Sequence, residues 1–119
     1  MNRAADNIRV LAASMVEKAK SGHPGGAMGG ADFMNVLYSE YLVYDPENPF
    51  WEGRDRFFLD PGHMSTMLYS TLAFTGKFTM DELAQFRQWD SPTPGHPERC
   101  VWKSEEAQKQ IATWARVAA

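Results

Sequence analysis

The chain has 119 residues, which corresponds to one domain or part of one. Its 12 Lys and Arg and 15 Asp and Glu give a net charge of -3, so the composition argues against a nucleic-acid partner. No apolar run is long enough to cross a membrane, and the N-terminus lacks the apolar stretch of a signal peptide. The single cysteine, Cys100, cannot form an internal disulfide or a multi-thiolate metal site. We therefore expect a cytoplasmic protein.

The N-terminal third predicts two helices separated by a glycine-rich break. Apolar residues recur at helical spacing over residues 3–20 and again from about 30 to 43. Between them, the sequence Ser-Gly-His-Pro-Gly-Gly at 21–26 contains residues that end helices. A loop with two prolines is expected at 45–49.

The segment 56–60 predicts a short buried strand. Its sequence, Arg-Phe-Phe-Leu-Asp, is apolar and aromatic in the middle, and Pro61 and Gly62 end it abruptly. A helix is expected from about His63 to a stop at Gly76. Since one strand cannot form a sheet, the pattern indicates either a mostly helical chain or part of an α/β domain whose other strands lie elsewhere.

The last third predicts two further helices around a proline-rich loop. Thr79 and Glu82 have the spacing of a capping box, in which each side chain accepts a backbone N–H at a helix start. This helix is expected to run to about Trp89. A proline-rich loop follows at 91–97, and Ser104 is placed to begin a final helix.

Three histidines each follow a glycine, in segments expected to interrupt helices. The pairs are Gly22-His23, Gly62-His63 and Gly95-His96. Glycine permits a ligand to approach the backbone, and imidazole offers both a donor and an acceptor near neutral pH. Three loop imidazoles can converge on one pocket, where a hydroxyl-rich or phosphate-bearing ligand suits them. A three-histidine zinc site and three unrelated loop histidines are the alternatives.

The Gly62-His63 pair follows the predicted strand and opens a helix. Ligands of α/β sheets bind beyond the carboxyl ends of strands, and helix N-termini attract anions. We therefore expect a phosphate near His63. Arg87, just before the proline-rich loop, has two interpretations, as an anion ligand or as a packing residue.

Four motifs, in order and spacing, resemble the N-terminal part of the transketolase family. They are Ser21-Gly22-His23-Pro24-Gly25, the Asn-Pro-x-Trp-x-x-Arg-Asp-Arg-Phe pattern at 48–57, Gly62-His63 with Leu68-Tyr69-Ser70 downstream, and Phe86-Arg87-Gln88 with Thr93-Pro94-Gly95-His96-Pro97-Glu98. The resemblance extends over residues 4–99. It implies that residues 1–99 are the N-terminal part of a thiamine diphosphate-binding domain, and that 100–119 form a divergent, helix-like tail.

The resemblance implies an α/β fold with a parallel sheet flanked by helices, to which this stretch contributes mainly helices and one or two strands. It implies the transfer of a two-carbon ketol unit between sugar phosphates, in the pentose phosphate pathway, by a cytoplasmic homodimer. Thiamine diphosphate, with Mg²⁺ or Ca²⁺, carries the difficult chemistry. The family's metal ligands and cofactor-activating glutamate lie in motifs absent from this sequence, so we expect this chain alone to be inactive.

Residue roles carry over by motif. His23 and His96 are expected to be catalytic and to contact the substrate, His23 by assisting proton transfer and His96 at the hydroxyl end of the donor sugar. His63 and Gly62 are expected to bind the diphosphate of the cofactor. No metal ligand is expected within the chain.

One departure concerns Asp60 and Pro61, where many members have Ser-Asn before the second Gly-His. Pro61 removes a backbone donor and Asp60 adds negative charge, which weakens the case for an anion at this turn. The Asp60-x-Gly62-His63 pattern is similar to deoxyxylulose phosphate synthase, a related thiamine diphosphate enzyme, whereas the loop at 93–98 favours transketolase. A catalytically inactive interaction module with exposed apolar surface is a further alternative.

Overall fold

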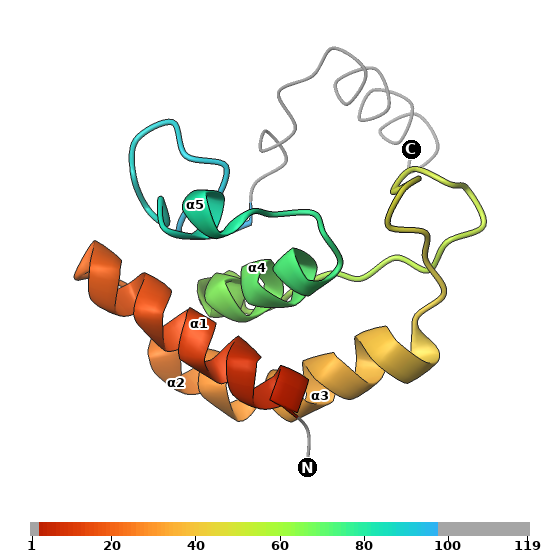
Figure 1. Cartoon of the computed structure of the whole chain (residues 1–119), viewed down its shortest axis with the longest axis horizontal. Helices are drawn as coiled ribbons and strands as arrows, with labels where there is room; N and C mark the ends of the chain where they lie inside the picture. Colours follow the sequence, from red (N-terminus) through yellow and green to blue (C-terminus); the bar gives the residue numbers. More distant parts are fainter. Residues whose placement is uncertain (1–2, 98–119) are drawn as a thin grey trace.

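The structure is a computed structural model that describes residues 3–97, whose regular elements are all helical (Figure 1). They are, in chain order, α1 (Arg3–Ala19), α2 (Pro24–Gly29), α3 (Ala31–Val36), the π-helical turn η1 (Leu37–Tyr41), the 3-10 turn η2 (Gly62–Met64), α4 (Ser65–Phe74) and α5 (Met80–Leu83). α1 packs against α2, α3 and α4, and α5 packs against α4. No helix in this range is long and apolar enough to cross a membrane.

Two apolar clusters hold the helices together. The first joins α1 to α2, α3 and α4, and its buried members are Ala5, Ile8, Ala12, Ala27, Ala31, Met34 and Met67. The second, around α1, α4 and α5, consists of Met15, Tyr69, Leu83 and Phe86. Gly26 lets α2 lie very close to η2: a Cβ at Gly26 would lie 2.8 Å from Cγ of Met64. This close packing fixes α2, which His23 precedes, against η2, which contains Gly62 and His63.

The helix predicted at 3–20 is confirmed as α1, and its end has the geometry of a Schellman motif. Lys20 has a left-handed φ of 50°, and the N–H of Ser21 donates to the carbonyl of Val16 (3.3 Å). The predicted stop at Gly76 is also confirmed, since this residue has a φ of 83° and follows the end of α4. Both helix ends therefore follow from local sequence.

The predicted break at 21–26 is too long. α2 begins at Pro24, because proline is well tolerated in the first turn of a helix, and His23 is its N-cap residue. The helix predicted from about 30 to 43 is present as α3 followed by η1, which ends at Tyr41.

The capping box of Thr79 and Glu82 is confirmed. The Thr79 hydroxyl accepts the Glu82 N–H (3.2 Å), and the Glu82 carboxylate accepts the Thr79 N–H (2.8 Å). The helix is shorter than the expected length to Trp89, because α5 ends at Leu83 and the following backbone forms turns. Arg87 has a φ of 61°, which interrupts any further helix.

The strand predicted over 56–60 does not form. This segment belongs to an irregular connection, residues 42–61, which lies to one side of the helices (Figure 1). A strand requires a neighbouring strand to take its backbone hydrogen bonds, and none of residues 3–97 forms one. The connection is held locally, by the N–H of Asp55 donating to the carbonyl of Val43 (2.7 Å). The expectation of mainly helical structure is confirmed, whereas the one or two strands are absent from the described residues.

Candidate active site

The first two candidate histidines are in ring contact. His23 precedes α2, and His63 lies in η2. Their ring centroids are 5.1 Å apart with the planes at 62°, an edge-to-face arrangement. Both side chains are exposed and therefore accessible to a ligand. The contact follows from the tight packing of α2 against η2 at Gly26.

The third candidate, His96, lies against the same turn. A Cβ built on Gly62 would lie 3.3 Å from Cγ and 3.4 Å from Nδ1 of His96, so the imidazole packs on the bare glycine backbone. The structure thus gathers all three Gly-His pairs at η2, as expected from their shared pattern. The position of His63 at the entry to α4 is confirmed, whereas its role and those of His23 and His96 stay predictions.

The loop that carries His96 is anchored to α4. The Ser65 hydroxyl donates to the carbonyl of Gly95 (2.7 Å), and the Tyr69 hydroxyl donates to the carbonyl of Pro94 (2.9 Å). These two side chains are four residues apart and so lie on one face of the helix. Sequence reasoning did not assign them this role, although their spacing and their place just after η2 were visible signals.

Arg87 connects the loop of His23 to the loop of His96. Its Nη1 donates to the hydroxyl of Ser21 (2.6 Å). Its guanidinium also lies against Gly95, since a Cβ at that glycine would be 3.0 Å from Nε and 3.4 Å from Cζ. These contacts support the interpretation of Arg87 as a packing residue.

The histidine cluster does not have the arrangement of a metal site. Within the described range 3–97, no group of three His, Cys, Asp or Glu side chains is placed to hold a metal ion. The zinc alternative is therefore not supported by this geometry. What the cluster offers is three exposed imidazoles, whose nitrogens can donate to phosphate oxygens and exchange hydrogen bonds with sugar hydroxyls.

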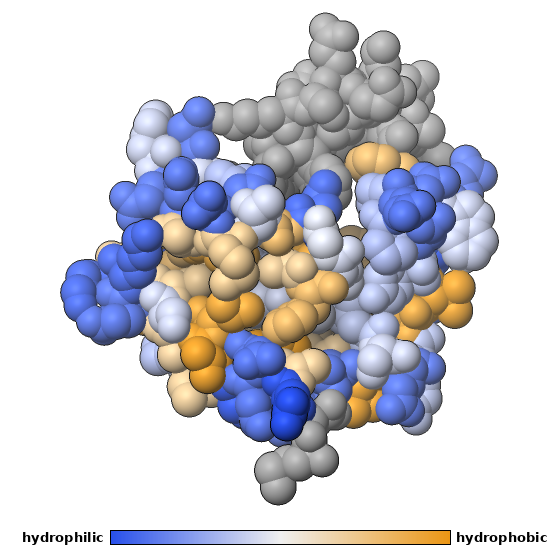
Figure 2. All heavy atoms as spheres, viewed as in Figure 1, coloured by the Kyte–Doolittle hydropathy of each residue, from blue (hydrophilic) through white to orange (hydrophobic). Residues whose placement is uncertain are grey.

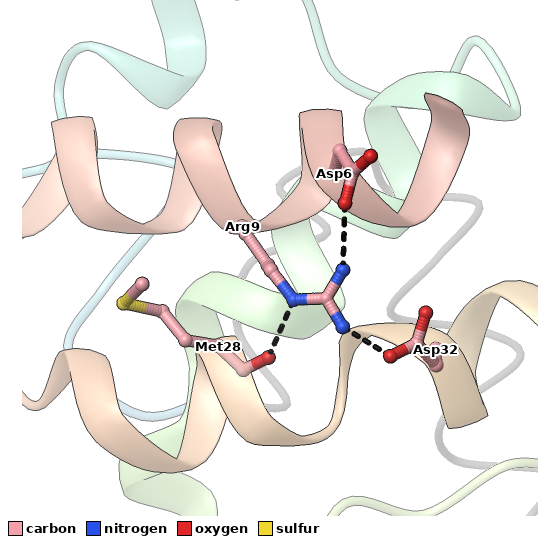
Figure 3. A network of polar contacts seen from close by, with 4 residues as sticks. All are labelled: Asp6, Arg9, Met28 and Asp32. Atoms are coloured by element: carbon pink, nitrogen blue, oxygen red, sulfur yellow. Dashed lines mark hydrogen bonds and ion pairs between the residues drawn. The ribbon is translucent and has the colours of Figure 1, made fainter. Parts of the chain in front are cut away.

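A second arginine, Arg9, lies away from the histidines and joins α1 to the end of α2 that is farther in sequence from His23 (Figure 3). From α1, Arg9 donates to Asp6 (2.9 Å), to the carbonyl of Met28 (3.2 Å) and to the carboxylate of Asp32. The network joins α1 to the end of α2 and the start of α3. Because its side chains are partly exposed, we expect the network to contribute little to stability.

A small cleft lies elsewhere in the molecule, between α1, η1 and α4. It has a volume of about 130 Å³, and Asn35, Tyr38 and Thr71 are among the residues that line it. Burial, with a smaller contribution from Tyr44, raises the pKa of Tyr38 to about 12. None of the three histidines lines this cleft, so we do not assign it to the candidate active site.

Comparison with known proteins gives a consistent result. Residues 1–109 match the family described as transketolase, thiamine diphosphate binding domain. The chloroplastic transketolase-1 of Arabidopsis thaliana is 50% identical over 100 residues, covering 82% of this chain and 14% of that protein. Transketolase 1 of Escherichia coli K12 is 53% identical over 95 residues, covering 79% of this chain and 14% of that protein.

Solved structures agree. Transketolase from Leishmania mexicana superposes with a TM-score of 0.80 at 47% identity, over 83% of this chain and 15% of that one. Transketolase from Pichia stipitis in complex with sedoheptulose 7-phosphate gives a TM-score of 0.80 at 40% identity, with the same coverage.

The family match and the similarity to solved structures thus identify part of a thiamine diphosphate-binding domain. The chain belongs to the transketolase family, within its thiamine diphosphate-binding domain, and spans about 14% of the length of the curated relatives it matches. The resemblance drawn from the motifs is confirmed. The division at residue 99 stays a prediction, because residues 100–119 lie outside the described part of the chain.

Proposed function

We propose that this chain supplies part of the active site of a transketolase, which transfers a two-carbon ketol unit between sugar phosphates with thiamine diphosphate. The observation that carries the proposal is the gathering of three Gly-His pairs at η2, in a chain of this family. Relatives solved in complex with sedoheptulose 7-phosphate and with fructose 6-phosphate support sugar phosphates as the substrate class.

In this proposal the histidines divide the work between substrate and cofactor. His23 and His96 bind substrate hydroxyls, and His23 also moves a proton to or from the reacting sugar. His63 donates to the diphosphate, and the backbone of Gly62 lies beside it. The three exposed imidazoles fit such a ligand. Thiamine diphosphate, when bound, supplies the nucleophilic carbon that the protein itself lacks.

Other parts of the proposal rest on the family alone. They are a Mg²⁺ or Ca²⁺ ion held by residues outside this sequence, a homodimer, a cytoplasmic location and a place in the pentose phosphate pathway. The same reasoning leads us to propose that the chain by itself does not turn over substrate. A deoxyxylulose phosphate synthase-like activity is the alternative, and the transketolases named above support ketol transfer in preference to it.

A role as an interaction module has one observation in its favour. Large apolar side chains are exposed, with Phe58 82% and Trp89 99% accessible, and Figure 2 shows apolar surface at the centre of one face. Exposed apolar surface of this kind is typical of regions that a partner covers. Co-elution of the chain with an intact transketolase is expected if it acts this way, and the absence of any complex would rule it out.

The main test is calorimetric titration of the 119-residue chain with thiamine diphosphate and Mg²⁺, with thermal unfolding alongside. Binding to the folded state stabilises it by about 2.7 kcal/mol at a ligand concentration of 100 times Kd, so the Tm rises. Thiamine without its diphosphate is the control ligand, and H63A is the control variant; both are expected to bind more weakly. A cooperative melt that the cofactor does not shift would contradict a diphosphate site in this chain.

The proposed inactivity has its own measurement. Purified chain supplied with cofactor, Mg²⁺ and sugar phosphates is expected to give no ketol transfer. Turnover by the pure 119-residue chain would overturn that part of the proposal.

A further inference from the structure

Arg87 is held in a backbone conformation that most residues avoid. Its φ of 61° lies in the left-handed region, which costs a non-glycine residue about 1 kcal/mol or more. The conformation is fixed by its own N–H, which donates to the carbonyl of Thr93 (3.0 Å). Thr93 is fully buried, and its hydroxyl donates to the carbonyl of Glu82 (2.8 Å). The position of the arginine is therefore set by the loop that carries His96.

The contacts around Arg87 close a circuit through the candidate site. Four contacts form it: Arg87 with Ser21, the His23 ring with the His63 ring, His96 with Gly62, and Gly95 with Arg87. Short stretches of chain join one contact to the next. The Ser21 step is a hydrogen bond between residues 66 positions apart in sequence. Arg87 is thus the one side chain in this circuit that contacts both the His23 loop and the His96 loop.

The chemistry of the guanidinium suits this bridging place. It is planar and carries several donors in a fixed geometry, so it can pack against Gly95 while one N–H donates to Ser21. A lysine ammonium could donate to Ser21 but would lack the planar group that packs against Gly95.

Two local costs argue that this arginine is not kept for stability alone. One is the left-handed backbone, and the other is its buried Nε, which has no acceptor among the described residues. A buried donor without a partner costs about 1–3 kcal/mol. Unfavourable geometry that is maintained at one residue is more typical of a functional position than of a purely structural one.

We propose that Arg87 is a positioning residue, which sets the spacing of His23 and His96 by holding Ser21 and Gly95. The inference rests on the proposed function, in which those two histidines bind one substrate. Arg87 itself acts through the two loops, and no contact with the substrate is required.

The test is NMR spectroscopy of the full chain with labelled histidine, at constant pH. It records nuclear Overhauser effects between the His23 and His63 rings and between the His96 ring and Gly62. In R87K we expect the His96–Gly62 effect to be lost and the imidazole shifts of His23 and His96 to move. The thermal melt is recorded alongside, so that a change in stability is separated from a change in geometry.

Two milder variants test separately the contact of Arg87 with the His23 loop and its contact with the His96 loop. S21A removes only the hydrogen bond and is expected to move the resonances of His23. G95A places a methyl group 3.0 Å from Nε of Arg87, and is expected to move those of His96. The matched control is R9K, which alters the other bridging arginine and is expected to leave all three imidazoles unchanged.

Unchanged imidazole contacts in folded R87K, or in both milder variants, would overturn the proposal and leave Arg87 a structural residue. Equal movement in R9K would also overturn it, because the effect would then not be specific. If R87K does not fold, S21A and G95A decide the question. No cofactor is present, so this outcome is independent of the calorimetric test of the proposed function.

Discussion

The helices and the connection at 42–61 show how differently two regions of one chain depend on their surroundings. A helix forms its backbone hydrogen bonds between residues of the same segment, and apolar side chains of α1, α2, α3 and α4 then bury one shared core. The connection contains a segment with the composition of a strand, but its backbone finds no ladder within residues 3–97. A short sequence can therefore specify a helix, whereas a strand also needs its neighbours.

The two regions are expected to differ most in the stability that is lost when one apolar side chain of each is truncated to alanine. Met34 is completely buried in the first cluster, so M34A is expected to destabilise the fold by about 2–5 kcal/mol. Phe58, in the connection, is 82% exposed, and F58A is expected to change stability by less than about 0.5 kcal/mol. Denaturant midpoints of the two variants measure the contrast. Equal losses would mean that the connection is packed in solution.

Two glycines in α2 provide a sharper test of the packing that brings His23 to His63. A Cβ at Gly26 would lie 2.8 Å from Cγ of Met64, so G26A forces the helices apart and is expected to cost about 1–3 kcal/mol. The matched control is G25A, one residue earlier, where a Cβ meets nothing within 4 Å. It is expected to stabilise by about 0.4–1 kcal/mol, by restricting the unfolded chain. Thermal unfolding of both variants measures these changes. An unchanged stability in G26A would refute the close packing of α2 against Met64.

The parts of the fold that the sequence predicted correctly are those set by neighbouring residues. The apolar stripe of α1, the capping box of Thr79 and Glu82, and the stop at Gly76 each involve side chains a few positions apart. The strand at 56–60 failed because composition does not report whether a partner strand is present. The start of α2 at Pro24 does not follow from the glycines and proline of 21–26, because proline ends helices in their interior but is tolerated in their first turn.

In the candidate site, too, features set by local sequence were predicted and contacts between distant segments were not. Three repeated Gly-His pairs predicted that the imidazoles would gather, and the contacts of His23 with His63 and of His96 with Gly62 agree. The contact that joins the His23 loop to the Arg87 segment could not be predicted from the sequence. The hydrogen bond from Arg87 to Ser21 joins residues 66 positions apart, and no local pattern indicates it.

A smaller change in stability, which depends on pH, is expected where η1 meets the connection. The Tyr38 ring, in η1, packs edge-to-face on Phe57 (5.9 Å between centroids) and Tyr44 (5.4 Å), both in the connection. Burial first, and then Tyr44, raises the pKa of Tyr38 from 10.0 to about 12. In the unfolded chain this phenol ionises near pH 10, whereas the fold keeps it neutral to a higher pH. Its contribution to stability is thus complete below pH 10 and is lost as the pH rises to 12.

The wild-type chain is therefore expected to lose stability between pH 10 and 12 that Y38F retains. A pKa rise of this size corresponds to at most about 2.7 kcal/mol, and the partial exposure of Tyr38 reduces the expected difference to about 1 kcal/mol. Denaturant unfolding at a series of pH values measures it, with Y41F as the control, since Tyr41 is 71% exposed. If Y38F and Y41F follow the same alkaline profile, Tyr38 is hydrated in solution, and the connection does not cover η1 as it does in this structure.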